Sequence, residues 1–216
     1  MNRGARPSRR WRRYAQALPM IALALTAAAE LAAGYWIPAK AALAQHLLER
    51  AWDQTRAGST VARPWPWADT VPVARLSVPS LGASWVVLSG ASGRNLAFAP
   101  SHLDGSALPG EPGVSVIAGH RDTHFEVLES LERGAHFELE RADGTRHDYV
   151  VTGMEIVNAD VDRLRLDGAD SVLALVTCYP FDATRAGGPL RYVVTAERST
   201  SAAARQARLP GGALLR

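Results

Sequence analysis

From residue 71 onward, short apolar or alternating runs follow one another, separated by glycine, proline and charged residues. A two-residue alternation is typical of a strand that buries one face, and a short apolar run between turn residues is typical of a buried strand. The segments with these patterns are residues 71–78, 84–88, 113–119, 136–141, 147–157, 171–178 and 190–197. An Asp-Gly pair in "ADGT", residues 142–145, predicts a hairpin. The pattern therefore predicts an all-β sandwich or barrel.

Helical patterns are confined to other parts of the chain. Residues 39–57 carry helix formers at helical spacing and predict a juxtamembrane helix, and residues 124–132 predict a short one. Two prolines, Pro64 and Pro66, break any continuation of the first helix, so a linker is expected there. The tail, residues 199–216, has no apolar periodicity and is predicted to be disordered.

The first 37 residues combine a basic cluster with a long apolar segment. Residues 14–37 are interrupted only by Gln16 and Glu30, and about 20 apolar residues suffice to cross a bilayer. Six arginines lie in the first 13 residues, so the positive-inside rule places the N-terminus in the cytoplasm and the rest outside. Two alternatives remain, a cleavable signal peptide and a soluble amphipathic helix, and Glu30 counts against a spanning segment.

Composition and charge narrow the class of protein. A chain of 216 residues with 47% hydrophobic content can bury one sizeable core. Its pI of about 9.4 reflects the N-terminal arginines, so we expect no nucleic-acid partner. The predicted organisation is a basic cytoplasmic segment, a transmembrane anchor, a helix with a linker, a catalytic barrel and a tail: residues 1–13, 14–37, 38–70, 71–198 and 199–216.

Cys178, the only cysteine, stands at the end of a predicted strand. A lone thiol forms no internal disulfide, and a cysteine at such a place is either a small buried hydrophobe or a nucleophile. His120 follows another predicted strand, so it too would emerge at a strand end. Arg191 opens the strand after Cys178, and antiparallel pairing of these two strands would make the two residues neighbours.

These three residue types suit one reaction. A thiolate attacks a carbonyl, and nearby positive charge favours the thiolate over the thiol. A histidine can protonate the leaving amine and later deprotonate an incoming nucleophile. A guanidinium is always charged and suits a developing oxyanion. The predicted roles are therefore nucleophile for Cys178, general acid/base for His120 and oxyanion stabiliser for Arg191.

The segments that carry these residues resemble the His, Cys and Arg motifs of sortases, the membrane-anchored cysteine transpeptidases. They read "GVSVIAGHRDTHF", "LALVTCYPF" and "GPLRYVV", and their form is similar to the class D-like and Gram-negative branches. The resemblance covers residues 71–198. Ala174 departs from it, standing where the family often has Thr. The implied fold is an eight-stranded β-barrel with short helices, preceded by an N-terminal transmembrane helix.

The same resemblance implies an activity and its partners. Sortases cleave a C-terminal sorting signal, often LPxTG-like, between Thr and Gly, and an amine resolves the acyl-enzyme. The expected partners are a surface protein bearing such a signal, an amine acceptor and the cell membrane. The expected location is the cytoplasmic (inner) membrane, crossed once, with the catalytic domain outside the cytoplasm. No cofactor and no metal are expected.

Other interpretations of the same residues compete with this one. Arg185 lies in the loop after Cys178 and competes with Arg191 for the cationic role, although a strand holds a side chain more rigidly than a loop. His120, Asp122 and His124 have a spacing that suggests metal ligands, but nothing nearby completes a zinc site.

Two further hypotheses concern the whole protein. An L,D-transpeptidase would carry a "SHGC"-type signature, whereas the chain reads "LVTC" there. A non-catalytic anchored β-barrel that acts as a scaffold or adhesin would leave Cys178 buried and unreactive. The acidic residues in 158–170 hint at a cation site but are also typical of a solvated loop.

Overall fold

The computed structural model describes residues 9–59, 61–185 and 187–199. The chain forms two compact units, Met1–Ala44 and Gln45–Arg216. Helix α1 (Arg9–Arg56) begins in the first unit and ends in the second, and Pro19 and Pro38 lie inside it. The predicted apolar span and the helix expected at 39–57 therefore form one helix. By length and composition alone, Leu18–Arg56 of α1 is the single candidate among the described residues for crossing a membrane.

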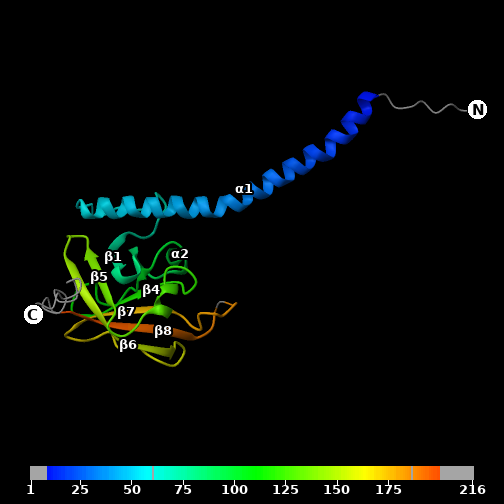
Figure 1. The fold of residues 1–216 in the computed structure, drawn as a ribbon. Coiled ribbons are helices and arrows are strands. Elements are labelled where there is room, and N and C mark those ends of the chain that lie inside the picture. The colour runs from blue at the N-terminus through cyan, green and yellow to red at the C-terminus, as the bar shows by residue number, and fades with distance from the viewer. Residues whose placement is uncertain (1–8, 60, 186, 200–216) are drawn as a thin grey trace, which may run out of the picture. The chain divides into compact units, whose positions relative to one another are not determined.

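The second unit contains eight strands that close into a barrel (Figure 1). In chain order they are β1 (Pro72–Val78), β2 (Ala83–Ser89), β3 (Ser101–His102), β4 (Gly113–Ala118), β5 (His136–Arg141), β6 (Arg146–Asn158), β7 (Ser171–Cys178) and β8 (Leu190–Arg198). Around the barrel the order is β1-β2-β3-β4-β7-β8-β6-β5. The expectation of an all-β, eight-stranded barrel is confirmed. The sequence pattern missed β3, because a strand of two residues has no periodicity to detect.

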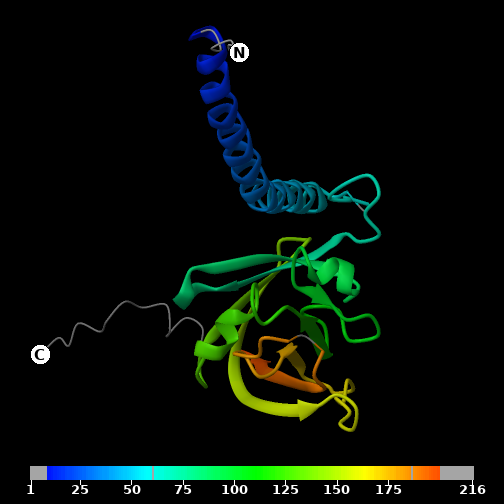
Figure 2. The same cartoon turned by 90° about the vertical axis from the view of Figure 1, so that its right-hand side faces the viewer.

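The pairing directions decide what meets at each end of the barrel. β4 and β7 are parallel, whereas β7 and β8 are antiparallel. The carboxyl ends of β4 and β7 therefore lie together, beside the start of β8. β6 is long and curved, as Figure 2 shows, and a register shift between Val151 and Gly153 interrupts its pairing with β8. Such a bulge bends the bulged strand.

Alternate residues of the strands fill the barrel interior. The apolar side chains there are almost completely buried; they include Leu76, Val87, Ile117, Phe137, Leu139, Leu173, Leu175 and Val194. Each fully buried Leu, Ile, Val or Phe contributes about 1.5–3 kcal/mol. Strands that the sequence pattern predicted thus supply most of the core.

Short helices connect the strands. They are η1 (Pro79–Leu81), α2 (Gly93–Leu96) and η2 (Glu126–Ser130). The short helix predicted at 124–132 is the 3₁₀ helix η2, which buries Leu128 and offers its glutamates to solvent. The predicted hairpin joins β5 to β6, where Gly144 has a φ of 82°.

The last turns of α1, residues 45–56, pack on the barrel of the second unit. Leu48 is fully buried against Leu88 of β2. Arg75 of β1 forms an ion pair with Glu49 and lies 5.8 Å from the centre of the Trp52 ring. These contacts make this part of the helix a component of the folded domain.

Candidate active site

Cys178 and Arg191 face each other across two antiparallel strands. Cys178 is the last residue of β7, and its register partner in β8 is Arg191. Directly opposite residues have Cβ atoms about 4.5–5.5 Å apart. The amide N–H of Tyr179 donates to the carbonyl of Leu190 at 3.1 Å and continues the ladder past the cysteine. The strand pairing expected from the sequence therefore brings these two residues together.

His120 arrives at the same end of the barrel from the other side of β7. Ala118 ends β4 opposite Val176 of β7 in parallel register, and His120 follows two residues later, as Cys178 follows Val176. The amide of Gly119 donates to the Val176 carbonyl at 3.0 Å, which extends the pairing beyond the strand. All three predicted site residues thus lie at one end of the barrel.

Two residues next to the site fix the ends of β4 and β7. The buried hydroxyl of Thr177 donates to the Gly119 carbonyl at 2.8 Å. A Cβ on Gly119 would lie 2.7 Å from ring atoms of Phe125, so only glycine fits there without a shift. His120 and Cys178 are each half-buried beside these fixed residues. Neither contact could be predicted from the sequence, although "AGH" and "VTC" are the motifs that point to the site.

The strand alternation places the reactive groups on the outer face of the barrel. Leu175 and Thr177 are buried on the inner face or at its rim, so Val176 and Cys178 point to the other face. On that outer face lies a groove of about 530 Å³. It is lined by apolar side chains and by four charged ones; the apolar ones are Leu103, Val116, Ile156, Val157, Ala159, Leu164, Val176 and Val193, and the charged ones are Glu155, Asp162, Arg163 and Arg191. Val176 of this lining lies in β7, two residues before the cysteine.

Arg191 has backbone partners in this structure. Its Nη1 donates to the carbonyls of Gly188 and Leu190 at 2.6 and 2.8 Å. Among the residues that the structure describes, no hydrogen bond joins the side chains of Cys178, His120 and Arg191. The guanidinium is therefore held near the cysteine strand by its own loop.

The other candidates for the cationic and metal-binding roles lie beside the site. The side chains of Arg185 and Asp122 are exposed. Burial, and after it the positive charge of His120, lowers the pKa of His124. Within the described ranges, no group of three His, Cys, Asp or Glu side chains is arranged to hold a metal.

Arg121 is a residue whose role the sequence did not predict. It follows His120, and its Nη2 donates to the carbonyls of Ala183 and Arg185 at 2.6 and 3.0 Å. These acceptors belong to the loop between Cys178 and Arg191. A backbone acceptor 62 residues away leaves no signature in a single sequence.

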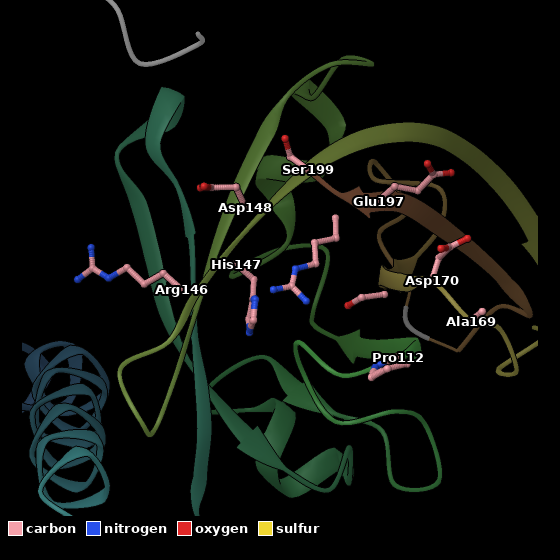
Figure 3. Close-up of a pocket in the computed structure, with 10 residues that line it drawn as sticks. Pro112, Arg146, His147, Asp148, Ala169, Asp170, Glu197 and Ser199 are labelled. Atoms are coloured by element: carbon pink, nitrogen blue, oxygen red, sulfur yellow. The ribbon is translucent and has the colours of Figure 1, made fainter. Parts of the chain in front are cut away.

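A larger cavity, of about 800 Å³, lies where β7 begins (Figure 3). Asp170 and Glu197 lie on one side of it and Arg146 and His147 on the other. Cys178 is seven residues further along β7 than Ser171, a distance of roughly 23 Å at about 3.3 Å per residue. This charged cavity is therefore separate from the end of the barrel that holds the three site residues.

Comparison with known proteins identifies the family. The family model described as the Sortase domain matches residues 76–199. Sortase D of Bacillus subtilis (strain 168) is 31% identical over 126 residues, which are 58% of this chain and 63% of that protein. The match therefore spans less than two thirds of that relative.

Solved structures of two sortases are similar to this chain. Sortase C-1 of Actinomyces oris is 31% identical, with a TM-score of 0.53 over 60% of this chain and 73% of that one. Sortase C1 of Streptococcus agalactiae is 26% identical, with a TM-score of 0.54 over 60% of this chain and 68% of that one.

The chain folds into a closed eight-stranded barrel with Cys, His and Arg at one end, and the Sortase domain matches most of that barrel. These two findings define the class of protein. The chain belongs to the sortase family, as its motifs suggest. Sortases are cysteine transpeptidases.

Proposed function

We propose that this protein is a membrane-anchored cysteine transpeptidase that cleaves a C-terminal, LPxTG-like sorting signal and transfers the cleaved protein to an amine. The observation that supports it best is the register of β7. Cys178 lies opposite Arg191 of β8, and Cys178 and His120 each follow by two residues the paired positions Val176 and Ala118. Membership of the sortase family adds the reaction class.

In the first half of the proposed reaction, the thiolate of Cys178 attacks the carbonyl carbon at the scissile bond. The C–S bond forms, Arg191 stabilises the oxyanion, and the C–N bond breaks. His120 gives a proton to the departing amine. The peptide then remains on the enzyme as a thioester.

In the second half, an acceptor amine attacks the thioester. The new C–N bond forms, the C–S bond breaks, and the amine proton passes to His120. Water in place of the amine gives a free carboxylate, which is the hydrolase activity of the same site. The apolar groove beside Val176 suits an extended peptide with apolar side chains.

The anchor and topology form part of the proposal. The apolar part of α1 holds the protein in the cytoplasmic membrane, with the arginine-rich start inside and the barrel outside. Protease added to cells with a permeabilised outer layer should then digest the barrel, and full protection would contradict this topology.

The activity is tested with the full chain in detergent and a panel of LP-containing sorting peptides. Mass spectrometry should detect a covalent adduct on Cys178, and a short glycine peptide should convert it into a ligated product. The Cys178→Ala variant is the control. The competing scaffold hypothesis gains support if the panel yields no adduct and the thiol resists alkylation at neutral pH.

A further inference from the structure

The loop that joins the cysteine strand to the arginine strand, residues 179–189, is tied to the end of β4. We call it the β7–β8 loop. Arg121 Nη2 donates to the carbonyls of Ala183 and Arg185 at 2.6 and 3.0 Å, across more than 60 residues of sequence. Arg121 is also the neighbour of His120. The side chain of Arg121, which directly follows the proposed acid/base, thus holds the loop that follows the proposed nucleophile.

The two ends of the β7–β8 loop are held by other contacts. At its base Tyr179 donates to Leu190, and the ring of Phe181 packs against Tyr192 with centroids 5.3 Å apart. Further along, Pro189 accepts from Ala159 at 2.9 Å. For residues 183–185, in the middle, Arg121 is the only side chain outside the loop that forms a hydrogen bond, as far as the described residues extend.

The chemistry of this tether makes it hard to replace. A guanidinium is permanently charged and presents its donors in a rigid fork. Charge-assisted hydrogen bonds are about twice as strong as neutral ones. Because both acceptors are backbone carbonyls, substitutions in the loop leave the tether intact, whereas substitution of Arg121 removes it.

The rigidity of a loop beside a thioester matters because water competes with the amine for the thioester. Closing a site keeps water from hydrolysing a reactive intermediate. The β7–β8 loop starts directly after Cys178, and its carbonyls also hold Arg191 through Gly188. If the middle of this loop became more mobile, water would reach the thioester more easily, and the amine would not attack it faster.

We propose that Arg121 is a positioning residue that fixes the β7–β8 loop and thereby favours amine over water in resolving the thioester. This inference rests on the transpeptidase function proposed above. Arg121 acts through the loop, and the bonds that form and break are those already described for the amine and for water.

The test compares four forms of the full chain in detergent: the wild type, Arg121→Ala, Arg121→Lys and Arg133→Ala. Arg133 is an exposed arginine in a different loop and serves as the charge-matched control. The readout is the ratio of ligated to hydrolysed peptide at a fixed concentration of glycine peptide. Hydrogen exchange of the amides of residues 183–185 reports on the tether without any turnover.

We expect Arg121→Ala to lower the ratio about tenfold, because it removes both charge-assisted hydrogen bonds to the loop. Its amides at 183–185 should exchange faster, and its melting temperature should stay close to that of the wild type. Arg121→Lys keeps the charge and can reach one carbonyl, so it should restore part of the ratio. Arg133→Ala should behave like the wild type.

The outcomes separate this inference from the function on which it rests. An unchanged ratio, or unchanged exchange, in a folded Arg121→Ala overturns the role of Arg121 while the wild type still forms its adduct. A wild type that forms no adduct overturns the transpeptidase function itself and this inference with it. If Arg121→Ala does not fold, the ratio in Arg121→Lys decides: a value equal to the wild type overturns the proposal, and a reduced value supports it.

Discussion

The two ends of β7 differ in how their polar groups are satisfied. Where the strand begins, at Ser171, charged side chains surround a cavity of about 800 Å³. There His147 is 95% buried, and neither of its ring nitrogens has a hydrogen-bond partner among the described residues. Where the strand ends, at Cys178, the side chains of Thr177, Arg121 and Arg191 each donate to a backbone carbonyl.

This difference shows why cavity size is a poor guide to the site in this fold. Catalysis depends on groups that are already held in their working geometry, since such groups need no reorganisation during the reaction. The smaller groove has Arg191 and Val176 in its lining, whereas the larger cavity is lined by charged side chains of both signs and by His147.

The largest effect is expected at Cys178 and His120. Without the thiol no thioester can form, and without the imidazole the rate should fall about 10²–10⁴-fold. Because the two act in one step, the double alanine variant should be no worse than the Cys178 variant alone. Asp170→Asn, at the other end of β7, should leave the rate of adduct formation unchanged. A folded His120→Ala variant that forms adduct at the wild-type rate would argue against a shared mechanism.

A smaller effect is expected at Arg191. The Arg191→Ala variant should form adduct about 10²–10³-fold more slowly, because a single oxyanion donor is typically worth that factor. Arg185→Ala removes the competing cation of the same loop and should cost far less. The measurement is the rate of adduct formation by mass spectrometry. A larger loss for Arg185→Ala would transfer the cationic role to that residue.

Next in size is a pair of glycine substitutions, one at each end of the barrel. A Cβ at Gly119 would lie 2.7 Å from the Phe125 ring, and one at Gly110 would lie 2.5 Å from the His147 ring. Each alanine should destabilise the fold by about 1–3 kcal/mol, since overpacking costs that much. Thermal melts measure this loss. Activity per folded molecule should fall for Gly119→Ala only, so a matching fall for Gly110→Ala would remove the contrast.

The smallest effect concerns pH and His147. Burial, and after it the charges of Arg198 and Arg141, lowers the pKa of His147 below 6.5. The unfolded chain therefore binds this proton more readily than the fold, so stability is lost as pH falls below about 6.5 toward the lowered pKa. The melting temperature of His147→Gln should depend less on pH between 7 and 5 than that of the wild type. Equal slopes for the two proteins would show that His147 does not contribute.

Much of the barrel could be predicted from the sequence because its strands carry their own signal. β5 and β7 begin and end at the predicted residues, since charged or glycine-rich turns flank each apolar alternation. The pairing of β7 with β8 followed from their spacing, and it placed Cys178 opposite Arg191. Strand-end reasoning likewise placed His120 at the same end of the barrel.

Other features could not be predicted because they depend on contacts between distant segments. α1 is continuous through Pro38, where composition alone separates an apolar segment from an amphipathic one. The direction of the Arg191 guanidinium depends on the carbonyls of its loop, which a strand pattern does not describe. The predicted tail at 199–216 lies almost wholly outside the described residues, and only Ser199 is seen.

The parallel pairing of β4 with β7 has one more consequence. His120 and Gly119 belong to the chain before the largely exposed segment 159–170, whereas Thr177, Cys178 and Arg191 belong to the chain after it. A cut in that segment would divide the site between two fragments, one with the imidazole and one with the thiol. Exposed loops are where chains tolerate such cuts. Recovered turnover on mixing would then report fragment complementation, with β7 returning to its place between β4 and β8.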